Sequence, residues 1–424
     1  MMDVLPRLTS LLGIVVLIVF CWLMSSQRRL FPWRIVIGGL LLQFALATLV
    51  LRTQWGREFF DQANAAVNQM QSFVEKGSSF VFGLWDTTAV DGQANLLLKS
   101  FAFGVLPTVI FYSSLMAVLY HLGIMQWIVR AVAWVMQRSL GTSGPETLAA
   151  AANIFLGHTE APLVIKPFIP AMSRSELNAM MVGGFANVSA SLLGVYSDFG
   201  VDVGHLVTAS VISAPASLLI AKIMLPELPG VQVDAGLSLA KERASVNLIG
   251  AAADGASDGL KLALNIGAML IAFLALIAMA DYLLGQFGWW FGFRSIDNLP
   301  TLTLSRVLST LFAPAAWLIG VPWSECSYAG QLLGTKMLAN ELVAYQELGT
   351  MLKADPAILS ERTRTIMTYA LCGFANLGAI GIQVGGIGGL VPERRNEIAA
   401  LGFRAMIGGT IACLMTACVA GILI

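Results

Sequence analysis

Long apolar runs separated by short polar stretches dominate the chain. A bilayer core about 30 Å thick needs about 20 apolar residues in one helix. Runs of that length predict eight membrane spans, near residues 8–26, 33–51, 102–122, 176–197, 204–225, 260–285, 364–390 and 403–424. We therefore expect an all-α integral membrane protein.

A further segment is too short to span a bilayer and too apolar to be an ordinary loop. Gly144, Pro145 and Glu146 open a helix that should run to about Phe155. Residues 157–160 interrupt it, and a second arm should cover 162–172. Each arm of about 10 residues measures about 15 Å, which is half a bilayer. The pattern predicts a re-entrant hairpin with its tip near the membrane midplane.

A second segment has the same form. Pro322 and Glu325 open a helix through Leu338, and Asn340 and Glu341 precede an arm that ends near residue 352. Each hairpin is followed by a span that contains the tetrapeptide Gly-Phe-Ala-Asn, at 184–187 and at 373–376. Gly and Asn are poor helix formers, so both spans are predicted to unwind at this point.

The order of elements occurs twice: a span, a surface helix (123–140 or 302–320), a hairpin with a Glu at its tip, and a broken span. The spans at 102–122 and 260–285 are three crossings apart, so they should run in opposite directions and form an inverted repeat. The expected organisation is a scaffold with an interfacial helix (1–100), a first repeat (101–200), a connecting span and loop (201–258), a second repeat (259–392) and a C-terminal span (393–424).

Residues 57–76 place apolar side chains at helical spacing among Asp, Asn and Gln, which predicts an interfacial helix that ends at Gly77. Charges predict the orientation. Basic residues follow the first span, and they should face the cytoplasm. The loop with Asp198 and Asp202 should then lie outside. The basic residues used for this assignment are Arg28, Arg29, Arg34, Lys241, Arg243, Arg394, Arg395 and Arg404.

Composition narrows the function. Hydrophobic residues make up 57% of the 424 residues and charged residues 12%, against about 25% charged in soluble domains. The 25 basic and 25 acidic residues cancel, so nucleic acid is not an expected partner, whereas membrane lipid is. Five cysteines without a C-x-x-C pair and three dispersed histidines give no support for a metalloenzyme.

Inverted repeats with broken helices that meet at the midplane are typical of secondary transporters. Glu160 and Glu341 are predicted at the two hairpin tips, where an ionisable side chain is costly and usually functional. The structural alternative is that each glutamate only caps its own hairpin. Likewise, Asn187 and Asn376 could merely bond the free carbonyls of kinked helices.

Three stretches resemble the concentrative nucleoside transporters: residues 151–162, Asn-Glu-Leu-Val-Ala-Tyr at 340–345, and Gly-Phe-Ala-Asn at 373–376. The resemblance covers nearly the whole chain with the motifs in order. It implies a homotrimer of eight-span protomers in a bacterial inner membrane. It also implies import of nucleosides such as uridine or adenosine with a cation, usually Na⁺.

The resemblance also implies roles for individual residues. The nucleobase would face Gly157, His158, Thr159, Glu160 and Leu192, whereas the ribose and the face of the base would contact Glu341, Phe374, Asn376 and Ala379. Sodium would bind between the side chains of Asn153 and Asn187 and the carbonyls of Leu156 and Val188. Oxygen ligands suit such a hard cation.

Three positions depart from the family pattern. His158 replaces the usual Gln, Ala379 replaces a Ser that contributes to ribose binding, and Asn187 stands where Ser or Thr is usual. A neutral imidazole has one donor and one acceptor, so His158 cannot replace both donors of an amide. Because imidazole titrates near pH 6.5, we expect weaker transport at acidic pH or an altered base preference.

Four alternatives remain open at this stage. The coupling ion could be H⁺, carried by Glu160, Glu341 or His158, although the retained Asn153 argues against this. The two altered contacts could have changed the substrate. A membrane-embedded hydrolase lacks a Ser-His or Asp-Asp pair at usable spacing, so no enzyme activity is expected. A passive channel would equilibrate its substrate without concentrating it.

Overall fold

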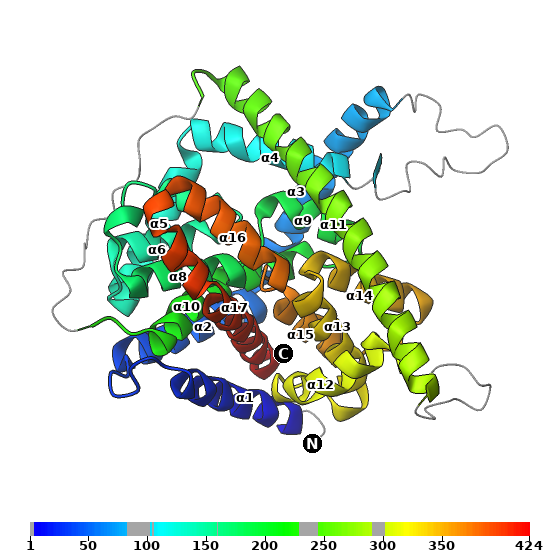
Figure 1. Cartoon of the computed structure of the whole chain (residues 1–424). Coiled ribbons are helices and arrows are strands. Elements are labelled where there is room, and N and C mark those ends of the chain that lie inside the picture. Colours follow the sequence, from blue (N-terminus) through cyan, green and yellow to red (C-terminus); the bar gives the residue numbers. More distant parts are fainter. Residues whose placement is uncertain (1–3, 83–101, 104–105, 159, 229–244, 291–301) are drawn as a thin grey trace.

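Helices form the described part of the chain, which comprises residues 4–82, 102–103, 106–158, 160–228, 245–290 and 302–424 of a computed structural model (Figure 1). The first half contains α1 (Val4–Leu23), α2 (Trp33–Arg52), α3 (Gln54–Val81), α4 (Leu106–His121), α5 (Ile124–Leu140), α6 (Gly144–Ala152), α7 (Ala161–Val164), η2 (Ile169–Ala171), α8 (Arg174–Ala186), η3 (Ala190–Leu192), α9 (Leu193–Asp198) and α10 (Val203–Met224). The second half contains α11 (Leu248–Trp290), α12 (Leu304–Leu318), η4 (Trp323–Glu325), α13 (Cys326–Leu338), α14 (Glu341–Ala354), α15 (Glu361–Leu371), α16 (Leu377–Leu390), η5 (Pro392–Arg394) and α17 (Arg395–Leu423). The predicted all-α class is confirmed.

Within the described residues, five helical segments are long and apolar enough to cross a membrane, or six if the bent pair α4–α5 is one span. The five are Leu5–Leu23, Trp33–Arg52, Arg174–Asp198, Val203–Met224 and Pro392–Leu423. The other three predicted spans correspond to α4, to part of α11, and to the broken pair α15–α16.

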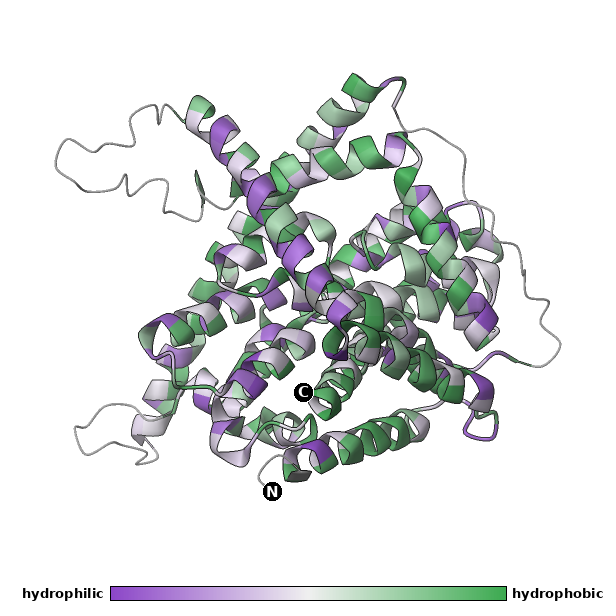
Figure 2. Ribbon diagram, turned by 180° about the vertical axis from the view of Figure 1, so that it is seen from behind, coloured by the Kyte–Doolittle hydropathy of each residue, from purple (hydrophilic) through white to green (hydrophobic). Residues whose placement is uncertain are grey.

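The surface helices follow the prediction in part. The chain bends by 78° between α4 and α5, and α5 and α12 occupy the two expected surface segments. α3 is longer than expected, so the assignment of Gly77 as its end is wrong. A single Gly inside a helix is less favourable than Ala by only about 1 kcal/mol. The helix therefore continues through Gly77 into a further turn that contains Phe80 and Val81. In Figure 2, α3 carries hydrophilic and hydrophobic residues along its length, whereas α1 is mostly hydrophobic.

Both predicted helix breaks are present. α8 ends at Ala186, and Asn187 is extended (φ −124°, ψ 162°). α15 ends at Leu371, and α16 restarts behind Asn376, whose side chain accepts a hydrogen bond from the Ala379 amide. Gly373 lies at the second break with φ 150°, and a Cβ there would lie 2.6 Å from Cys413 Sγ. Only glycine fits this position.

Hairpin 1 (residues 144–172) differs from the prediction in its second arm. A capping box of Ser143 and Glu146 opens α6 as expected, but the helix ends at Ala152 rather than near Phe155. The second arm is one helical turn (α7), further turns, and the short η2, rather than a continuous helix. Pro167 and Pro170 explain this, because both lie inside the predicted arm and each lacks the N–H that a continuous helix needs, whereas Pro162 is in the first turn of α7, where a proline is tolerated.

Hairpin 2 (residues 323–354) matches the prediction. It comprises η4, α13 and α14, and it contains no proline within these residues. The Asn340 side chain caps α14 by accepting from the Val343 amide at 2.9 Å. Each repeat therefore has the expected order of span, surface helix, hairpin and broken span.

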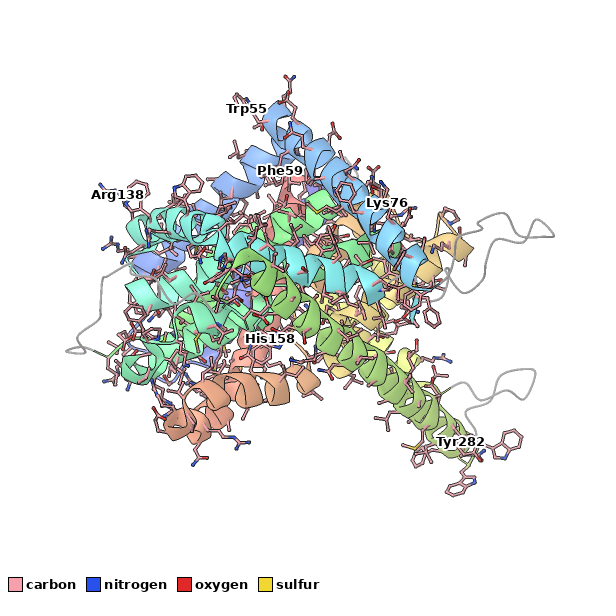
Figure 3. The ribbon with its side chains drawn as sticks, turned by 90° about the horizontal axis from the view of Figure 1, so that it is seen from above. Trp55, Phe59, Lys76, Arg138, His158 and Tyr282 are labelled. Carbon is pink, nitrogen blue, oxygen red and sulfur yellow. The ribbon has the colours of Figure 1, made fainter. Side chains whose placement is uncertain are left out.

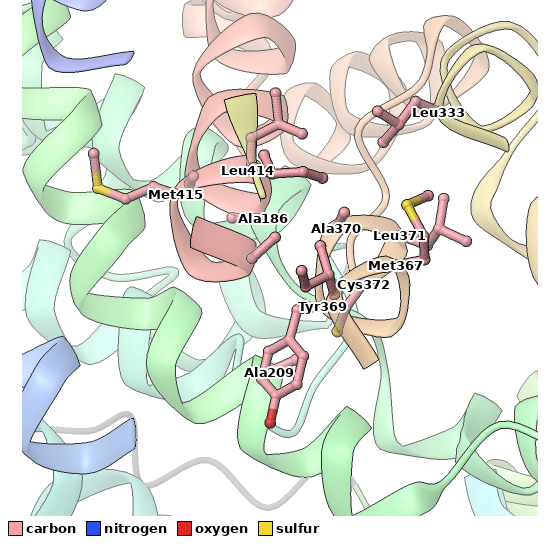
Figure 4. Packing of buried hydrophobic residues seen from close by; sticks show 14 of the residues in the cluster. Ala186, Ala209, Leu333, Met367, Tyr369, Ala370, Leu371, Cys372, Leu414 and Met415 are labelled. Atoms are coloured by element: carbon pink, nitrogen blue, oxygen red, sulfur yellow. The ribbon is translucent and has the colours of Figure 1, made fainter. Parts of the chain in front are cut away.

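The two breaks meet in the protein core beside α10 and α17. Ser213 of α10 donates to the freed carbonyl of Ala186 at 2.8 Å, and the Cys413 thiol of α17 donates to the carbonyl of Cys372 at 3.0 Å. Figure 4 shows Ala186, Cys372 and the α17 residues Leu414 and Met415 in this packing. The backbone groups freed by the breaks are therefore partly satisfied by neighbouring helices, as a membrane interior requires.

Candidate functional site

The predicted ion ligands Asn153 and Asn187 lie together beside Gly183 of α8. A Cβ on Gly183 would lie 3.0 Å from Asn153 Nδ2, and Asn187 Nδ2 donates to the Gly183 carbonyl at 3.1 Å. Both asparagines are buried. The Oδ1 atoms of both lack a hydrogen-bond donor among the described residues. Two unpaired amide oxygens on side chains that share the same neighbour, Gly183, suit a cation that prefers oxygen ligands.

The two predicted carbonyl ligands lie on non-helical backbone next to these asparagines. Leu156 lies in the turn that follows α6, and Val188 lies in the extended segment that follows α8. The two segments are joined directly, because the Ala190 amide donates to the Phe155 carbonyl at 3.0 Å. Hairpin 1 and the broken span thus form one unit around the candidate ion site.

The tip of hairpin 1 carries Gly157, His158 and Glu160, and Thr159 lies outside the described residues. Glu160 Oε2 accepts from the Gly157 amide at 3.2 Å. Glu160 therefore caps its own hairpin tip, which is one of the two alternatives that the sequence left open. Both ring nitrogens of His158 are buried and lack a partner among the described residues. Figure 3 shows His158 inside the molecule beside α16.

Glu341 of hairpin 2 is the most buried carboxylate of the predicted substrate site. Its Oε1 accepts from the Tyr196 hydroxyl at 3.2 Å, and its Oε2 is buried without a hydrogen-bond partner in the described part of the chain. The nearby Lys336 donates to the Ala370 carbonyl at 2.9 Å. Glu341 therefore retains an acceptor that is free for a ligand hydroxyl.

The remaining predicted residues come from the broken spans. The Phe374 ring lies 4.7 Å from the His158 ring in an edge-on contact. Asn376 and Ala379 are buried at the start of α16, and Leu192 is buried at the end of η3. The structure therefore brings His158 of hairpin 1 and Phe374 of the second broken span into direct contact, from opposite repeats.

A backbone hydrogen bond connects the predicted ion ligands with the predicted substrate residues. The Phe374 amide donates to the Asn187 carbonyl at 3.3 Å. Asn187 supplies an unpaired amide oxygen to the candidate ion site, and the Phe374 ring contacts His158. The Asn187 carbonyl is therefore connected directly to the peptide that holds the Phe374 ring.

Sequence reasoning missed three buried polar residues near the site. Tyr196 bonds to Glu341 across the two repeats. Gln383 of α16 lies beside Gly184, and Lys336 of hairpin 2 bonds to α15. Gln383 is a lone polar side chain in an apolar helix, whereas Tyr196 and Lys336 stand next to other polar residues, and none of the three belongs to a motif. Among the described residues, no group of His, Cys, Asp and Glu is suited to hold a metal ion.

Comparison with known proteins identifies the family. Residues 12–85 match the family described as "Na+ dependent nucleoside transporter N-terminus", and residues 205–421 match its C-terminal part. The chain belongs to this family of nucleoside transporters. Residues 102–201 match a segment described as "Nucleoside recognition". Members of the family are transporters and not enzymes, so the expectation of no enzyme activity is confirmed.

Relatives of this transporter occur in bacteria and vertebrates. It is 43% identical to an uncharacterized transporter of Haemophilus influenzae, over 98% of both chains. It is 41% identical to solute carrier family 28 member 3 of Mus musculus, over 98% of this chain but only 59% of that protein. This chain therefore spans about three fifths of the vertebrate relative.

Two solved structures share the fold over almost the whole chain. One is CNTnw in an inward-facing, substrate-bound state, with a TM-score of 0.90, 43% identity, and coverage of 99% of this chain and 98% of that chain. The other is a variant of CNTnw in an outward-facing state, with a TM-score of 0.90, 42% identity, and coverage of 99% and 97%. The same fold thus occurs in two conformations that open to opposite sides.

Proposed function

We propose that this transporter imports nucleosides together with Na⁺ by alternating access. The observation that carries the proposal is the pair of buried, unpaired oxygens of Asn153 and Asn187, joined to Phe374 through the Asn187 carbonyl. Leaving two buried amide oxygens without partners is unfavourable by about 1–3 kcal/mol each. A cation bound there removes this penalty and supports the binding-competent arrangement of the site.

Coupling follows from the connections of the ion residues. Asn153 belongs to hairpin 1, and Asn187 belongs to the first broken span. Binding one cation between them favours the arrangement in which the hairpin 1 tip and the Phe374 peptide are both held in place. The same arrangement presents the nucleoside contacts. Because coupling free energies are reciprocal, the nucleoside strengthens Na⁺ binding by the same factor.

The substrate contacts divide between the two hairpins. The tip of hairpin 1, with Gly157, Thr159 and Glu160, and the side chain of Leu192 face the nucleobase. Glu341 and Asn376 bind the ribose hydroxyls, and the Phe374 ring covers the base. Glu341 Oε2 supports this assignment because it is a buried carboxylate oxygen without a donor among the described residues.

The proposal includes the setting of the protein. We expect a homotrimer in the bacterial inner membrane, with lipid around its outer helices. α11 supports an intersubunit or lipid contact, because large apolar side chains along it are exposed in the single chain, including Leu264, Ile271, Leu283 and Trp290.

A binding experiment tests the coupling. Uridine affinity of the purified transporter is measured by calorimetry in NaCl and in choline chloride. We expect Na⁺ to tighten uridine binding by about 5- to 150-fold, the usual range of such couplings. Asn153→Leu should abolish the Na⁺ effect.

Asn178 provides the matched control for this experiment. It is a buried asparagine of α8 whose Oδ1 is also unpaired, and it contacts the Ala221 carbonyl of α10 instead of the site. Asn178→Leu should preserve the Na⁺ effect. Equal uridine affinity in both salts for the native transporter would refute Na⁺ coupling, and a pH-dependent affinity without Na⁺ would favour H⁺.

A further inference from the structure

Gln383 is a fully buried residue of α16, the helix that is capped by Asn376. It lies one helical turn after Ala379, so the two side chains share a face of the helix. Gln383 Nε2 donates to the Met181 carbonyl of α8 at 3.2 Å. Its Oε1 is a buried acceptor without a donor among the described residues. Residue 383 therefore keeps one hydrogen-bonding position unused.

Gly184 brings Gln383 and His158 to the same place. A Cβ on Gly184 would lie 2.7 Å from Gln383 Nε2 and 2.9 Å from His158 Cβ. Any side chain at 184 would separate the two residues, so the glycine is needed for this close approach. The Gln383 amide and His158 therefore lie on either side of one glycine, and both have unused hydrogen-bonding atoms.

The His158 ring needs a partner to define its orientation. A neutral imidazole carries a proton on one nitrogen and a lone pair on the other. The hydrogen bond made by one nitrogen decides which form is present. Phe374 contacts the ring edge-on at 4.7 Å but provides no hydrogen-bond acceptor of this kind. The unused Oε1 of Gln383 is such an acceptor.

We propose that Gln383 is a positioning residue for nucleobase selection, which acts by accepting a hydrogen bond from the His158 ring N–H when a nucleoside is bound. The opposite ring nitrogen then presents its lone pair to the base. This site selects bases that place an amino group or another N–H donor at His158. The inference rests on the proposed function, because it requires that the ligand is a nucleoside.

Transport kinetics with donor-deleted nucleosides test this role. Two pairs remove one amino group without adding bulk: cytidine and its analogue without the 4-amino group, and adenosine and its analogue without the 6-amino group. We expect the native transporter to prefer the amino compound in at least one pair. Gln383→Leu should reduce that ratio of KM values about fivefold, which is the effect of one hydrogen bond.

Three further variants separate positioning from a structural role. His158→Ala should lose the ratio, and adding Gln383→Leu to it should cause no further change, because the two residues act as one unit. Gln43 of α2 is also fully buried with an unpaired Oε1, and its Nε2 contacts Met415 Sδ of α17 instead of the neighbourhood of His158. Gln43→Leu should therefore leave the ratio unchanged.

Several results would overturn the inference. One such result is that Gln383→Leu lowers Vmax, or raises KM equally for both members of each pair, because a residue that only supports packing would have this effect. The Gln383→Leu effect could also persist in full without the imidazole of His158. Failure of the proposed function is a different outcome, since the native transporter would then take up none of the nucleosides.

Discussion

Replacing Glu341 by Gln tests whether this carboxylate binds the ribose. Glu341 is the first residue of α14 and is only 4% exposed. Its Oε1 accepts from Tyr196 at 3.2 Å, and its Oε2 has no donor among the described residues. Glutamine has the same shape, but its NH₂ group cannot accept a hydrogen bond from a sugar hydroxyl. The substitution therefore removes one acceptor and the negative charge without creating a cavity.

The expected loss follows from the hydrogen bond that Glu341 would make. A hydrogen bond to a charged group contributes about 1.5–3 kcal/mol, and 1.4 kcal/mol changes affinity tenfold. We expect Glu341→Gln to raise the KM for uridine by about 10- to 100-fold. The KM for 2′,3′-dideoxyuridine, which lacks both hydroxyls, should change by less than about twofold.

The assay is radiolabelled uptake into proteoliposomes, with KM determined for both compounds. Tyr196→Phe removes the donor to Oε1 and should raise the uridine KM only about fivefold, the effect of one ordinary hydrogen bond. Glu347, on the same helix, accepts from Thr335 at 2.9 Å and lies outside the proposed site, so Glu347→Gln should leave both KM values unchanged. Equal increases for uridine and the dideoxy compound in Glu341→Gln would refute a ribose contact.

Three further predictions concern other residues. Ala379→Ser restores a hydroxyl, so it should increase the preference for ribonucleosides over deoxyribonucleosides in competition uptake; strict ribose preference of the native transporter would contradict the reasoning. His158→Gln replaces an imidazole that has one donor by an amide that has two, so it should change the ratio of the KM values for uridine and adenosine; an unchanged ratio would exclude a role of His158 in base preference. Lys222→Met leaves Glu146, its ion-pair partner at 2.7 Å, buried and uncompensated, and should destabilise the protein by about 3–5 kcal/mol. The Tm, determined from the fraction of protein that remains folded in size-exclusion chromatography after heating, measures this loss of stability. An unchanged Tm would contradict the prediction.

The helix breaks could be predicted because they depend on local chemistry. Gly and Asn inside an apolar run disfavour a continuous helix wherever the run lies, and both breaks occur at the predicted tetrapeptides. The apolar length of the second arm of hairpin 1 predicts a helix that starts at Pro162, but Pro167 and Pro170 inside the arm interrupt it. The apolar run at 260–285 predicts only part of α11, which is 43 residues long. Its polar first turns, with Asp254 and Asp258, have no apolar pattern, although no helix breaker separates them from the span.

The contacts between the repeats could not be predicted from the sequence. Tyr196 and Glu341 are 145 residues apart, and Gln383 lies beside Gly184 only because α16 packs against α8. Such pairs depend on how helices pack, not on the spacing of residues along one helix. The resemblance to a family predicts which side chains line the site, whereas the packing determines which of them share a hydrogen bond.

Uptake into proteoliposomes under separately imposed gradients tests the central claim most directly. Radiolabelled uridine or adenosine is supplied outside, with either an inward Na⁺ gradient or an inward H⁺ gradient. We predict accumulation of intact nucleoside above the external concentration with Na⁺ alone, and loss of this accumulation in Asn153→Leu. Accumulation driven by a pH gradient without Na⁺, or uptake that stops at equilibrium under both gradients, would contradict the account.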